Sequence, residues 1–378
     1  MTQPTLRVLA IVPSLYDTSP GQRFRMEQWA PALRERGIDV TFEAFEDEAL
    51  HAALYASGQT ARKVTLILQA LWRRTALMAR LRRYDVVYVL REAALLGPAL
   101  FERWIRWAGR PLVFDFDDAV FERYVSPANG YLSYLKCPGK TRSVCRIATH
   151  VMAGNPYLDS YARQVTDRIT IVPTTIDLDT YRVPAARLTP EKLVIGWSGS
   201  YSTVQHLDTI RPILQRLART ESFRLLVIGT DRYAIDGVEV EARRWRAATE
   251  VEDLAEMDIG IMPLPDDRWS RGKCGLKALQ YMAIGIPTVC SPVGANSLFI
   301  QSGENGLLAD SEEEWITGLT QLLQSGELRS RLGGAGRRTV EQRYSKAALT
   351  PVVAEILTSV SGRTGRPGVK PTGRQGRK

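Results

Sequence analysis

Two segments of the chain carry arginine or lysine where a helix is expected to begin. The first, GQRFR, contains Gly21, Arg23 and Arg25, and the second, RGKCGLK, contains Lys273 and Lys277. A helix N-terminus is partly positive, so each cation in the first turn costs about 0.3–1 kcal/mol. A bound anion would offset that cost, because backbone N–H groups and cations both stabilise negative charge. The pattern predicts phosphate or diphosphate at both starts, and the alternative is that these side chains extend into solvent.

Small residues accompany these cations. Gly21 and Gly275 would let the backbone approach a phosphate closely. Ser198 and Gly199 follow the first predicted strand of the second half, where small side chains would let a ligand pass close to backbone amides. Neither GxGxxG nor GxxxxGK(S/T) occurs after a predicted strand, which excludes dinucleotide dehydrogenases with the usual fingerprint and P-loop nucleotidases.

Acidic side chains follow one strand, and an arginine–glutamate pair follows the strand before it. Asp115, Asp117 and Asp118 lie in the run DFDD, and Arg91 and Glu92 come directly after DVVYVL. The acids could bind a divalent metal, orient a substrate hydroxyl, or hold Arg91 through an ion pair. Arg91 and Glu92 could face a ligand at the carboxyl edge of the sheet or form a surface ion pair. Because no histidine lies nearby and cations are already supplied, we expect no metal and no cofactor.

Short apolar runs alternate with amphipathic stretches, a pattern typical of βαβ units and parallel sheets. In the first half, strands are predicted at 6–12, 40–45, 85–90, 111–116, 150–153 and 169–172, with helices at 23–36, 66–83 and 98–108. In the second half, strands are predicted at 192–197, 223–228, 258–262 and 287–290, with helices at 204–219, 275–284 and 347–360. We therefore expect an α/β protein made of two Rossmann-like halves.

A turn-rich stretch after Pro173 divides the two halves. The predicted organisation is an N-terminal Rossmann-like domain at 1–175, a C-terminal one at 190–345, a closing helix at 346–361 and a disordered basic tail at 362–378. Six of the nine net positive charges lie in the last 18 residues, which contain no acid and are rich in Gly and Pro. Such a tail cannot bury enough apolar surface to fold. Only this tail would support nucleic-acid binding, so we expect no specific nucleic-acid partner.

Cysteine usage and hydropathy bear on location. The four cysteines include no CxxC pair, which excludes a disulfide scaffold and argues against a structural zinc site. The opening residues lack the features of a secretory signal and no apolar run reaches 18 residues, so we expect a cytoplasmic protein. The segment 62–83 carries seven Lys or Arg and no acid. It could make peripheral contact with an anionic inner membrane surface, although we favour a helix packed on the sheet with a solvated basic face.

Several segments resemble the GT-B glycosyltransferases related to family 4. The clearest is Asp258–Ile300, in which a glycine-rich loop leads into a helix that ends in the pattern ALQYMAIGIP. The runs ENGLLAD at 304–310 and RRTVEQRYS at 337–345 are also typical, and SPGQRFRMEQWAPALRERGIDV and FDFDDAVFE look like the bacterial subgroup. The resemblance implies a GT-B fold in which two Rossmann-like domains face a cleft and a C-terminal helix returns towards the N-terminal domain.

The resemblance also implies a function. The protein would transfer a sugar from a nucleotide-diphosphate sugar to a glycan or lipid-linked acceptor in cell-envelope polysaccharide synthesis. The N-terminal domain would hold the acceptor and the C-terminal domain the donor, with retention of anomeric configuration. The expected catalytic residues are Arg23, Arg25, Arg91, Glu92, Asp117 and Lys273. The expected donor-binding residues are Gly21, Ser198, Gly199, Lys273, Gly275, Lys277 and Gln280.

One departure from the family pattern keeps other functions open. The family often has two glutamates eight residues apart, which contact the donor sugar and the ribose, whereas this chain has Gly272 and Gln280. A glutamine can still hydrogen-bond ribose hydroxyls, but glycine supplies no carboxylate. The alternatives are a nucleotide-sugar 2-epimerase of the same fold, or an inactive protein that binds nucleotide or glycan.

Overall fold

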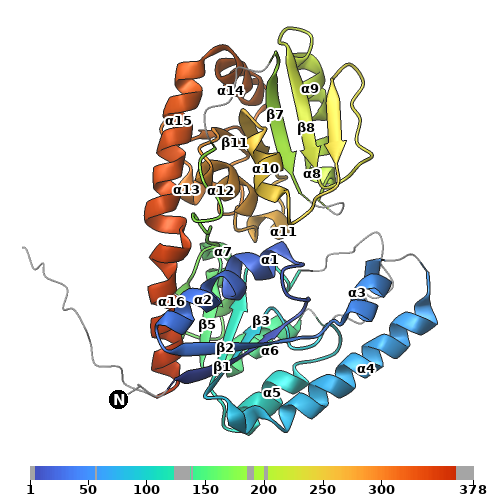
Figure 1. Ribbon diagram of the computed structural model, residues 1–378, viewed down its shortest axis with the longest axis vertical. Helices are drawn as coiled ribbons and strands as arrows, with labels where there is room; N and C mark the ends of the chain where they lie inside the picture. The colour runs from blue at the N-terminus through green and yellow to red at the C-terminus, as the bar shows by residue number, and fades with distance from the viewer. Residues whose placement is uncertain are drawn as a thin grey trace, which may run out of the picture.

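Two parallel six-stranded sheets, one in each half of the chain, form the framework of the protein (Figure 1). The computed structural model describes residues 5–55, 58–122, 137, 139–184, 191–199 and 203–362. The N-terminal strands are ordered β2-β1-β3-β4-β5-β6 and the C-terminal strands β12-β11-β10-β7-β8-β9. All paired strands of both sheets run parallel. The α/β class with two Rossmann-like halves is confirmed.

The N-terminal sheet is covered by helices on both faces. Its strands are β1 (Leu6–Val12), β2 (Ile38–Ala44), β3 (Val86–Leu90), β4 (Leu112–Phe116), β5 (His150–Ala153) and β6 (Ile169–Ile171). One face packs against α2 (Gln28–Glu35) and α16 (Lys346–Val360). The other packs against α4 (Thr60–Met78), η2 (Leu81–Arg83), α5 (Leu100–Trp107), α6 (Gly139–Ile147) and α7 (Pro156–Arg163). A smaller helix, α3 (Glu48–Tyr55), packs on α4.

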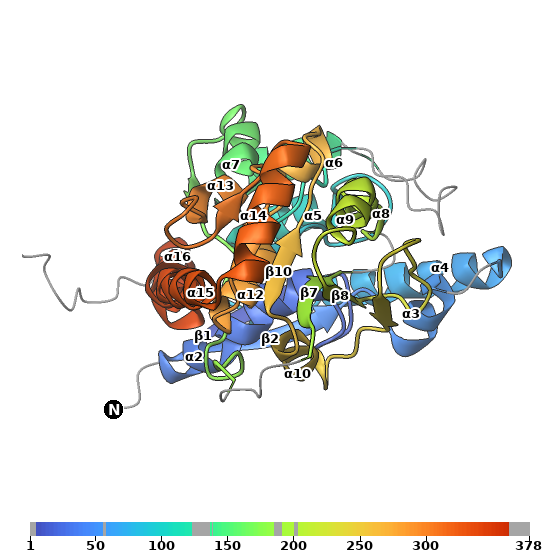
Figure 2. The same cartoon turned by 90° about the horizontal axis from the view of Figure 1, so that it is seen from above.

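The C-terminal sheet is built in the same way, as the view from above shows (Figure 2). Its strands are β7 (Leu193–Ser198), β8 (Phe223–Ile228), β9 (Val240–Arg243), β10 (Ile259–Met262), β11 (Thr288–Cys290) and β12 (Leu307–Leu308). One face packs against α8 (Gln205–Asp208), α9 (Arg211–Leu217), α14 (Glu312–Gln324) and α15 (Gly326–Thr339). The other packs against α10 (Glu250–Ala255), α12 (Leu276–Ala283), α13 (Asn296–Phe299) and η4 (Val340–Tyr344). A short helix, α11 (Arg268–Arg271), precedes α12.

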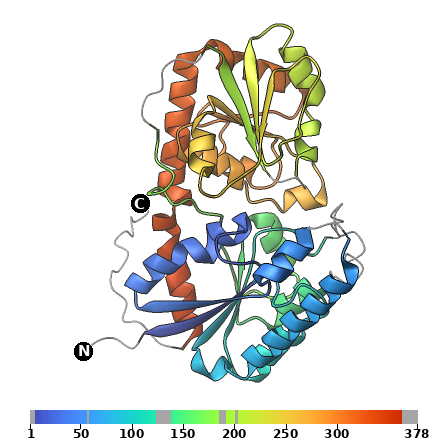
Figure 3. The ribbon, with the colours of Figure 1, turned by 45° about the vertical axis from the view of Figure 1, so that its right-hand side comes forward.

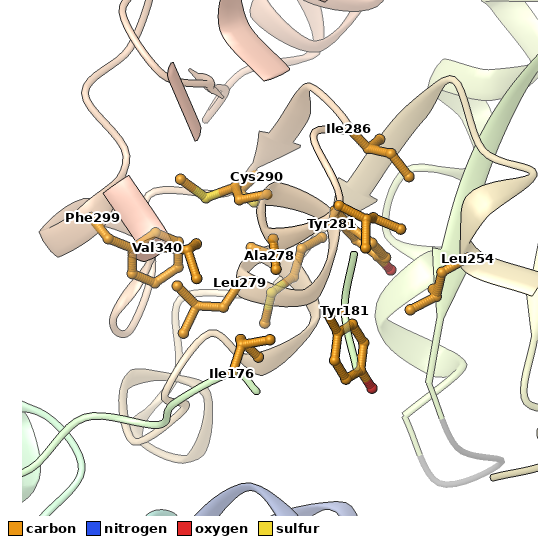
Figure 4. Close-up of a cluster of buried hydrophobic side chains, with 14 of the residues drawn as sticks. Ile176, Tyr181, Leu254, Ala278, Leu279, Tyr281, Ile286, Cys290, Phe299 and Val340 are labelled. Carbon is orange, nitrogen blue, oxygen red and sulfur yellow. The ribbon is translucent and has the colours of Figure 1, made fainter. Parts of the chain in front are cut away.

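The core beside α12 fixes where that helix begins. Ala278, Leu279 and Tyr281 of α12 are fully buried and pack with residues of α10, η4 and the segment after Pro173 (Figure 4). Tyr181, in that segment, belongs to the same buried cluster. Close packing on several sides leaves α12 little freedom to shift. The loop before α12 is therefore held at the carboxyl edge of the C-terminal sheet.

The closing helix joins the two halves. Val353, Ile356 and Leu357 of α16 are buried in the core of the N-terminal sheet, together with Trp29 and Leu33 of α2. Figure 3 shows α15, η4 and α16 as one long path that follows both halves. The C-terminal helix thus returns to the N-terminal half, as the resemblance implies. Residues 363–378, most of the basic tail, lie outside the described residues.

Two predicted helices are wrong in detail. The helix expected at 23–36 is broken into α1 (Pro20–Gln22), a π-turn η1 (Arg23–Glu27) and α2, and the backbone of Arg25 has a non-helical φ of −125° and ψ of −118°. The helix expected at 204–219 is divided into α8 and α9, with a proline in the first turn of α9. Proline is favoured in a first turn and disfavoured inside a helix.

Two strands escaped prediction, β9 and β12. The burial of β9 is only partial along its whole length, VEAR, and β12 is only two residues long. Neither produces the apolar run that marks a buried parallel strand. None of the described helices is both long and apolar enough to cross a membrane.

Candidate functional site

The loop before α12 touches the carboxyl edge of the N-terminal sheet. Lys273 Nζ lies 2.8 Å from Asp118 Oδ1, and Cys274 Sγ donates to the carbonyl of Asp117 at 3.2 Å. The Nδ2 atom of Asn155 donates to the carbonyls of Arg271 and Lys273, while its Oδ1 accepts from Leu158 N–H as the N-cap of α7. Loops from both halves therefore meet around Lys273.

Arg91 is held on the N-terminal side of this contact. Its guanidinium makes a two-point ion pair with Asp117 at 2.7 and 3.0 Å and also reaches Asp118 at 3.1 Å. The backbone of Arg91 has φ of +60°, a strained conformation that clusters at functional sites. A Cβ added at Gly21 would lie 2.4 Å from an Arg91 nitrogen, so a larger residue there would require the Arg91–Asp117 pair to shift. Of the three roles considered for these acids, the ion pair with Arg91 is the one present in the structure.

Lys277 is an uncompensated cation. Its Nζ lies 5.6 Å from the centre of the Trp197 ring, and among the described residues it has no hydrogen-bonded or ion-paired partner. Burial, reinforced by the charge of Lys273, lowers the pKa of Lys277 to about 8. Burial and the charges of the two lysines lower the pKa of His206 to about 4. Unbalanced positive charge at this place favours an anion.

The N-terminus of α12 adds to that positive charge. Gly275 is its N-cap with φ of +73°, no side chain caps the helix, and no acid lies in its first turn. In α14, by contrast, Ser311 and Glu314 form a complete capping box. A Cβ on Gly275 would lie 2.5 Å from the Phe299 ring, so no larger residue fits without a shift. An uncapped helix end beside two lysines is suited to phosphate.

A second cluster centres on Glu250, a buried carboxylate at the start of α10. It accepts hydrogen bonds from four groups: Arg23 Nη1 at 2.9 Å, Tyr181 Oη at 2.7 Å, Trp245 Nε1 at 2.9 Å and Gln280 Nε2 at 3.0 Å. Gln280 Nε2 also donates to Tyr181 Oη at 2.9 Å. Because Arg23 belongs to the N-terminal half, this carboxylate links the two halves.

Arg23 and Lys273 belong to different clusters. Arg23 pairs with Asp17 at 2.6 Å and with Glu250, whereas Lys273 pairs with Asp118. The structure does not join the two cations at one group. Gln280 is only 3% exposed and its amide nitrogen is already bonded within the protein. A ribose could take a hydrogen bond from Gln280 only by replacing one of these partners.

Arg25 is not placed to contact a ligand, which corrects the sequence-based expectation. Its side chain is fully buried and forms a two-point ion pair with Asp115 at 2.7 and 2.5 Å. It also donates to the carbonyl of Val172 at 2.8 Å, and Tyr88 donates to Asp115. The attraction of Asp115 outweighs burial and raises the pKa of Arg25. Arg25 thus stabilises the core rather than an anion.

The backbone N–H groups of Ser198 and Gly199, which were expected to lie close to a ligand, are bonded within the protein instead. The N–H of Ser198 donates to Tyr281 Oη at 2.7 Å, and that of Gly199 donates to the carbonyl of Ile228 at 2.8 Å. A Cβ on Gly199 would lie 2.2 Å from the Trp197 ring. These residues are small because the strand end is tightly packed, and their amides are not free for a ligand.

The remaining acidic residues expected at the site, Glu92 and Asp117, lie beside cations. Glu92 lies 3.5 Å from Lys140, which also approaches the buried Glu102 at 3.5 Å. Within the part of the chain that the structure describes, no group of three or more His, Cys, Asp or Glu side chains could hold a metal. Asp117 and Asp118 instead neutralise Arg91 and Lys273.

Gly272, which replaces a family glutamate, lies where the two halves touch. A Cβ at this position would be 2.6 Å from the Cβ and 2.7 Å from the backbone nitrogen of Ala119. Contacts this short with backbone cannot be relieved by a rotamer change. In this arrangement of the halves, a glutamate could not occupy position 272.

Sequence reasoning missed Glu250, Tyr181 and Tyr281. Glu250 opens a helix whose first turn also contains Glu252 and Asp253, and acids at that place are ordinary. Tyr181 lies in the turn-rich stretch between the halves, and the aromatic Tyr281 fits the apolar pattern of α12. No local pattern distinguishes these three from helix-capping or core residues.

Comparison with known proteins links part of this chain to a glycosyltransferase family. Residues 192–325 match the family described as glycosyl transferases group 1. The chain is 29% identical over 108 residues to the lipopolysaccharide core biosynthesis glycosyltransferase LpsE of Rhizobium meliloti, covering 28% of this chain and 30% of that protein. It is 27% identical over 220 residues to a D-inositol 3-phosphate glycosyltransferase of Xylanimonas cellulosilytica, covering 50% and 52%. The matches thus span about a third and about half of these relatives.

Solved structures extend the likeness to the whole fold. The sucrose-phosphate synthase of Thermosynechococcus elongatus superposes with a TM-score of 0.70 at 15% identity, covering 95% of this chain and all of that one. Anabaena HepE in complex with UDP and glucose superposes with a TM-score of 0.68 at 15% identity, covering 94% of this chain and 100% of that one. At such identity the likeness shows the fold, which is GT-B.

Proposed function

We propose that this chain, which belongs to the group 1 glycosyltransferases and has the GT-B fold, moves a sugar from a nucleotide-diphosphate sugar to a glycan or lipid-linked acceptor. The observation that carries the proposal is the unbalanced charge of Lys277 at the uncapped start of α12. This helix lies inside the segment that matches the family. HepE, which has the same fold, was solved with UDP and glucose, and LpsE acts in lipopolysaccharide core biosynthesis.

The proposal assigns the donor to the C-terminal half, 190–345, and the acceptor to the N-terminal half, 1–175, with 346–361 as the closing helix. Two features support this division. Lys277 and the start of α12 belong to the C-terminal half, whereas the carboxyl edge of the N-terminal sheet contributes Arg91, Asp117 and Asp118. An acceptor at that edge would approach the donor from the opposite side of the contact between the halves.

The chemistry follows from where negative charge develops. When the sugar–diphosphate bond breaks, charge accumulates on the leaving diphosphate, and prearranged donors there lower the barrier. Lys273, Lys277 and the N–H groups of α12 can supply this stabilisation without a metal. Lys273 is paired with Asp118 in the structure, so a diphosphate would have to take the place of that carboxylate. The proposal includes retention of configuration, for which family resemblance is the support.

Arg23 and Arg91 have positioning roles in this proposal. Arg23 fixes Glu250, and through it Gln280, across the contact between the halves. Arg91 holds Asp117 and Asp118 beside Lys273. Each arginine is paired with a carboxylate, so in this structure neither has an unneutralised positive charge with which to bind an anion.

A donor screen in the presence of a chelator tests the function. Thermal unfolding with UDP-, GDP- and ADP-sugars should show stabilisation by at least one, of about 2.7 kcal/mol at 100 times its dissociation constant. Nucleotide release with acceptor, analysed together with the fate of the sugar, then separates transfer from epimerisation. A shift that requires Mn²⁺ or Mg²⁺ and disappears with chelator would instead indicate a metal at Asp117 and Asp118.

The pH dependence of nucleotide affinity offers a further prediction. Free Lys277 has a pKa lowered to about 8, and a bound diphosphate would raise it, because opposite charge favours the protonated form. Binding should therefore take up a proton at alkaline pH, and affinity should weaken as pH rises above about 8 but stay level just below it. Calorimetry in buffers of different ionisation enthalpy measures this uptake. An affinity that is constant from neutral pH to pH 9.5 would contradict the prediction.

The proposal extends to peripheral contact with an anionic membrane through 62–83. This segment forms α4 and η2. Buried positions of α4 pack on the sheet, as expected for an amphipathic helix, yet Val64, Leu68 and Trp72 are 48%, 60% and 74% exposed. A helix whose only contact was the sheet would not need an apolar stripe on its outer side.

A further inference from the structure

Six large apolar side chains, including Val64 at 48%, are exposed on two adjacent helices of the N-terminal half. Leu68 and Trp72 on α4 are 60% and 74% exposed, and Leu100, Trp104 and Trp107 on α5 are 62%, 38% and 84% exposed. These six residues define the α4–α5 face. Tryptophan is rarely left in water without a partner, since burying its ring is strongly favourable.

The exposed sides of α4 and α5 face away from the same side of the N-terminal sheet. The two helices pack on each other, and Figures 1 and 3 show them side by side on the N-terminal half, on the side away from the C-terminal sheet. Leu77 of α4 and Ile105 of α5 are buried in one cluster against one face of the sheet. The opposite sides of both helices therefore point away from that same sheet face. The exposed residues recur at i, i+4, i+8 on α4 and at i, i+4, i+7 on α5, which places each set on one side of its helix.

Positive charge is abundant on the same two helices and beside them. Exposed arginines on α4, α5 and the turns that follow α4 are Arg62, Arg73, Arg80, Arg82, Arg83, Arg103 and Arg106. The α4 helix contains no acid, and the one acid of α5, Glu102, is fully buried. One of the arginines, Arg73, is paired with Asp47. The two helices thus combine exposed apolar side chains with a strong excess of positive charge.

We propose that the α4–α5 face docks on an anionic lipid bilayer. Indole rings favour the level of the lipid headgroups, and arginines are attracted to a negative surface, so both features fit one occupant. A second copy of the chain fits less well, because two basic faces would repel each other. Docking here would hold the N-terminal half beside a lipid-linked acceptor. This connection to the acceptor rests on the proposed function. Compared with contact through 62–83 alone, the proposed docking adds α5 as half of the surface.

Vesicle co-sedimentation of the full chain tests this inference without needing catalysis. The probes are vesicles of phosphatidylcholine alone and of phosphatidylcholine mixed with phosphatidylglycerol, each at low and high salt. The variant carries Trp72→Ser and Trp107→Ser together, and a second variant carries Arg82→Gln and Arg103→Gln. The control variant carries Val183→Ser and Leu298→Ser, which remove apolar side chains that are 55% and 45% exposed elsewhere. Every variant keeps the basic tail, so the tail contributes equally to all.

The expected result is binding to the anionic vesicles that salt weakens, with little binding to neutral ones. The tryptophan variant should bind about tenfold or more weakly, and each lost arginine should cost about fivefold, while the control binds like the parent. Equal melting temperatures of parent and variants would show that folding is intact. Absence of binding to anionic vesicles, or binding that the tryptophan variant retains, would overturn the inference. So would a dimer in the absence of lipid that the same variant dissociates. None of these outcomes depends on glycosyl transfer, so they do not decide the proposed function.

Discussion

Replacing Lys277 with methionine is expected to lower kcat/KM for the donor by about ten- to a hundredfold while making the protein more stable. A charged hydrogen bond of the kind proposed here contributes about 1.5–3 kcal/mol, and each 1.36 kcal/mol corresponds to a factor of about ten in rate. Methionine keeps most of the unbranched apolar stem of the side chain and removes the ammonium group that lies over the Trp197 ring. Nucleotide release from the donor identified by the screen measures the loss.

The gain in stability has a definite pH dependence. Folding lowers the pKa of Lys277 from 10.5 to about 8, so the charged form destabilises the fold below about pH 8 and the parent gains stability as pH rises through this interval. The methionine variant should lack that rise and should melt a few degrees higher at neutral pH, at about 2–4 °C for each kcal/mol. Lys192→Met is the matched control, since Lys192 is 45% exposed and pairs with Glu239. Full activity together with unchanged melting would show that Lys277 is an ordinary surface lysine.

Adding Lys273→Met should reveal whether both lysines serve one anion. If both contact the same diphosphate, the losses in the double variant should differ from the sum of the single losses, because contacting groups couple. Lys273→Met also leaves Asp118 with Arg91 as its remaining cationic partner. Strictly additive losses in kcat/KM would indicate separate binding sites.

The largest effect on stability is expected from Asp115→Ala, which should lower the free energy of unfolding by about 3–5 kcal/mol. Arg25 and Asp115 are both fully buried, and removal of the carboxylate leaves a guanidinium with a single carbonyl acceptor, that of Val172. An unpaired buried charge is far more costly than the loss of a surface pair. Denaturant unfolding followed by tryptophan fluorescence measures the change.

A double variant, Arg25→Met with Asp115→Leu, separates the pair from its environment. Removing both charges avoids stranding either one, so this variant should recover much of the stability lost in Asp115→Ala. Glu239→Ala, which breaks an exposed pair with Lys192, should have little effect. Unfolding of Asp115→Ala at the same denaturant concentration as the parent would contradict the buried-pair assignment. Loss of donor affinity in a folded double variant would show that Arg25 has a ligand role after all.

The sequence predicts the framework well because parallel strands are buried on both sides. Leu6–Val12, His150–Ala153 and Phe223–Ile228 were predicted with the bounds that the structure has. The edge strand Val240–Arg243 was missed, since its partial burial leaves no apolar run. Burial on both sides, rather than strand propensity, makes a strand visible in sequence.

The candidate site could be predicted only in part. The spacing of residues along a helix does not show which carboxylate, distant in the sequence, will pair with each cation in the folded protein. Arg23 and Arg25 look equivalent in sequence, yet the π-turn sends one to Glu250 and the other to Asp115. Lys273 and Lys277 were both expected to bind the donor, but of the two only Lys277 lacks a partner among the described residues. Glu250 gave no signal, since acids at helix starts are common. Long-range ion pairs decided each of these outcomes.

The most direct measurement of the central claim is calorimetric binding of nucleoside diphosphates, with chelator present, to the parent, Lys277→Met and Lys192→Met. If the start of α12 holds the diphosphate, at least one of UDP, GDP and ADP binds the parent and the Lys192 variant alike, and binds the Lys277 variant about tenfold or more weakly. Equal affinity for all three proteins, or binding only after a divalent metal is added, would contradict the account.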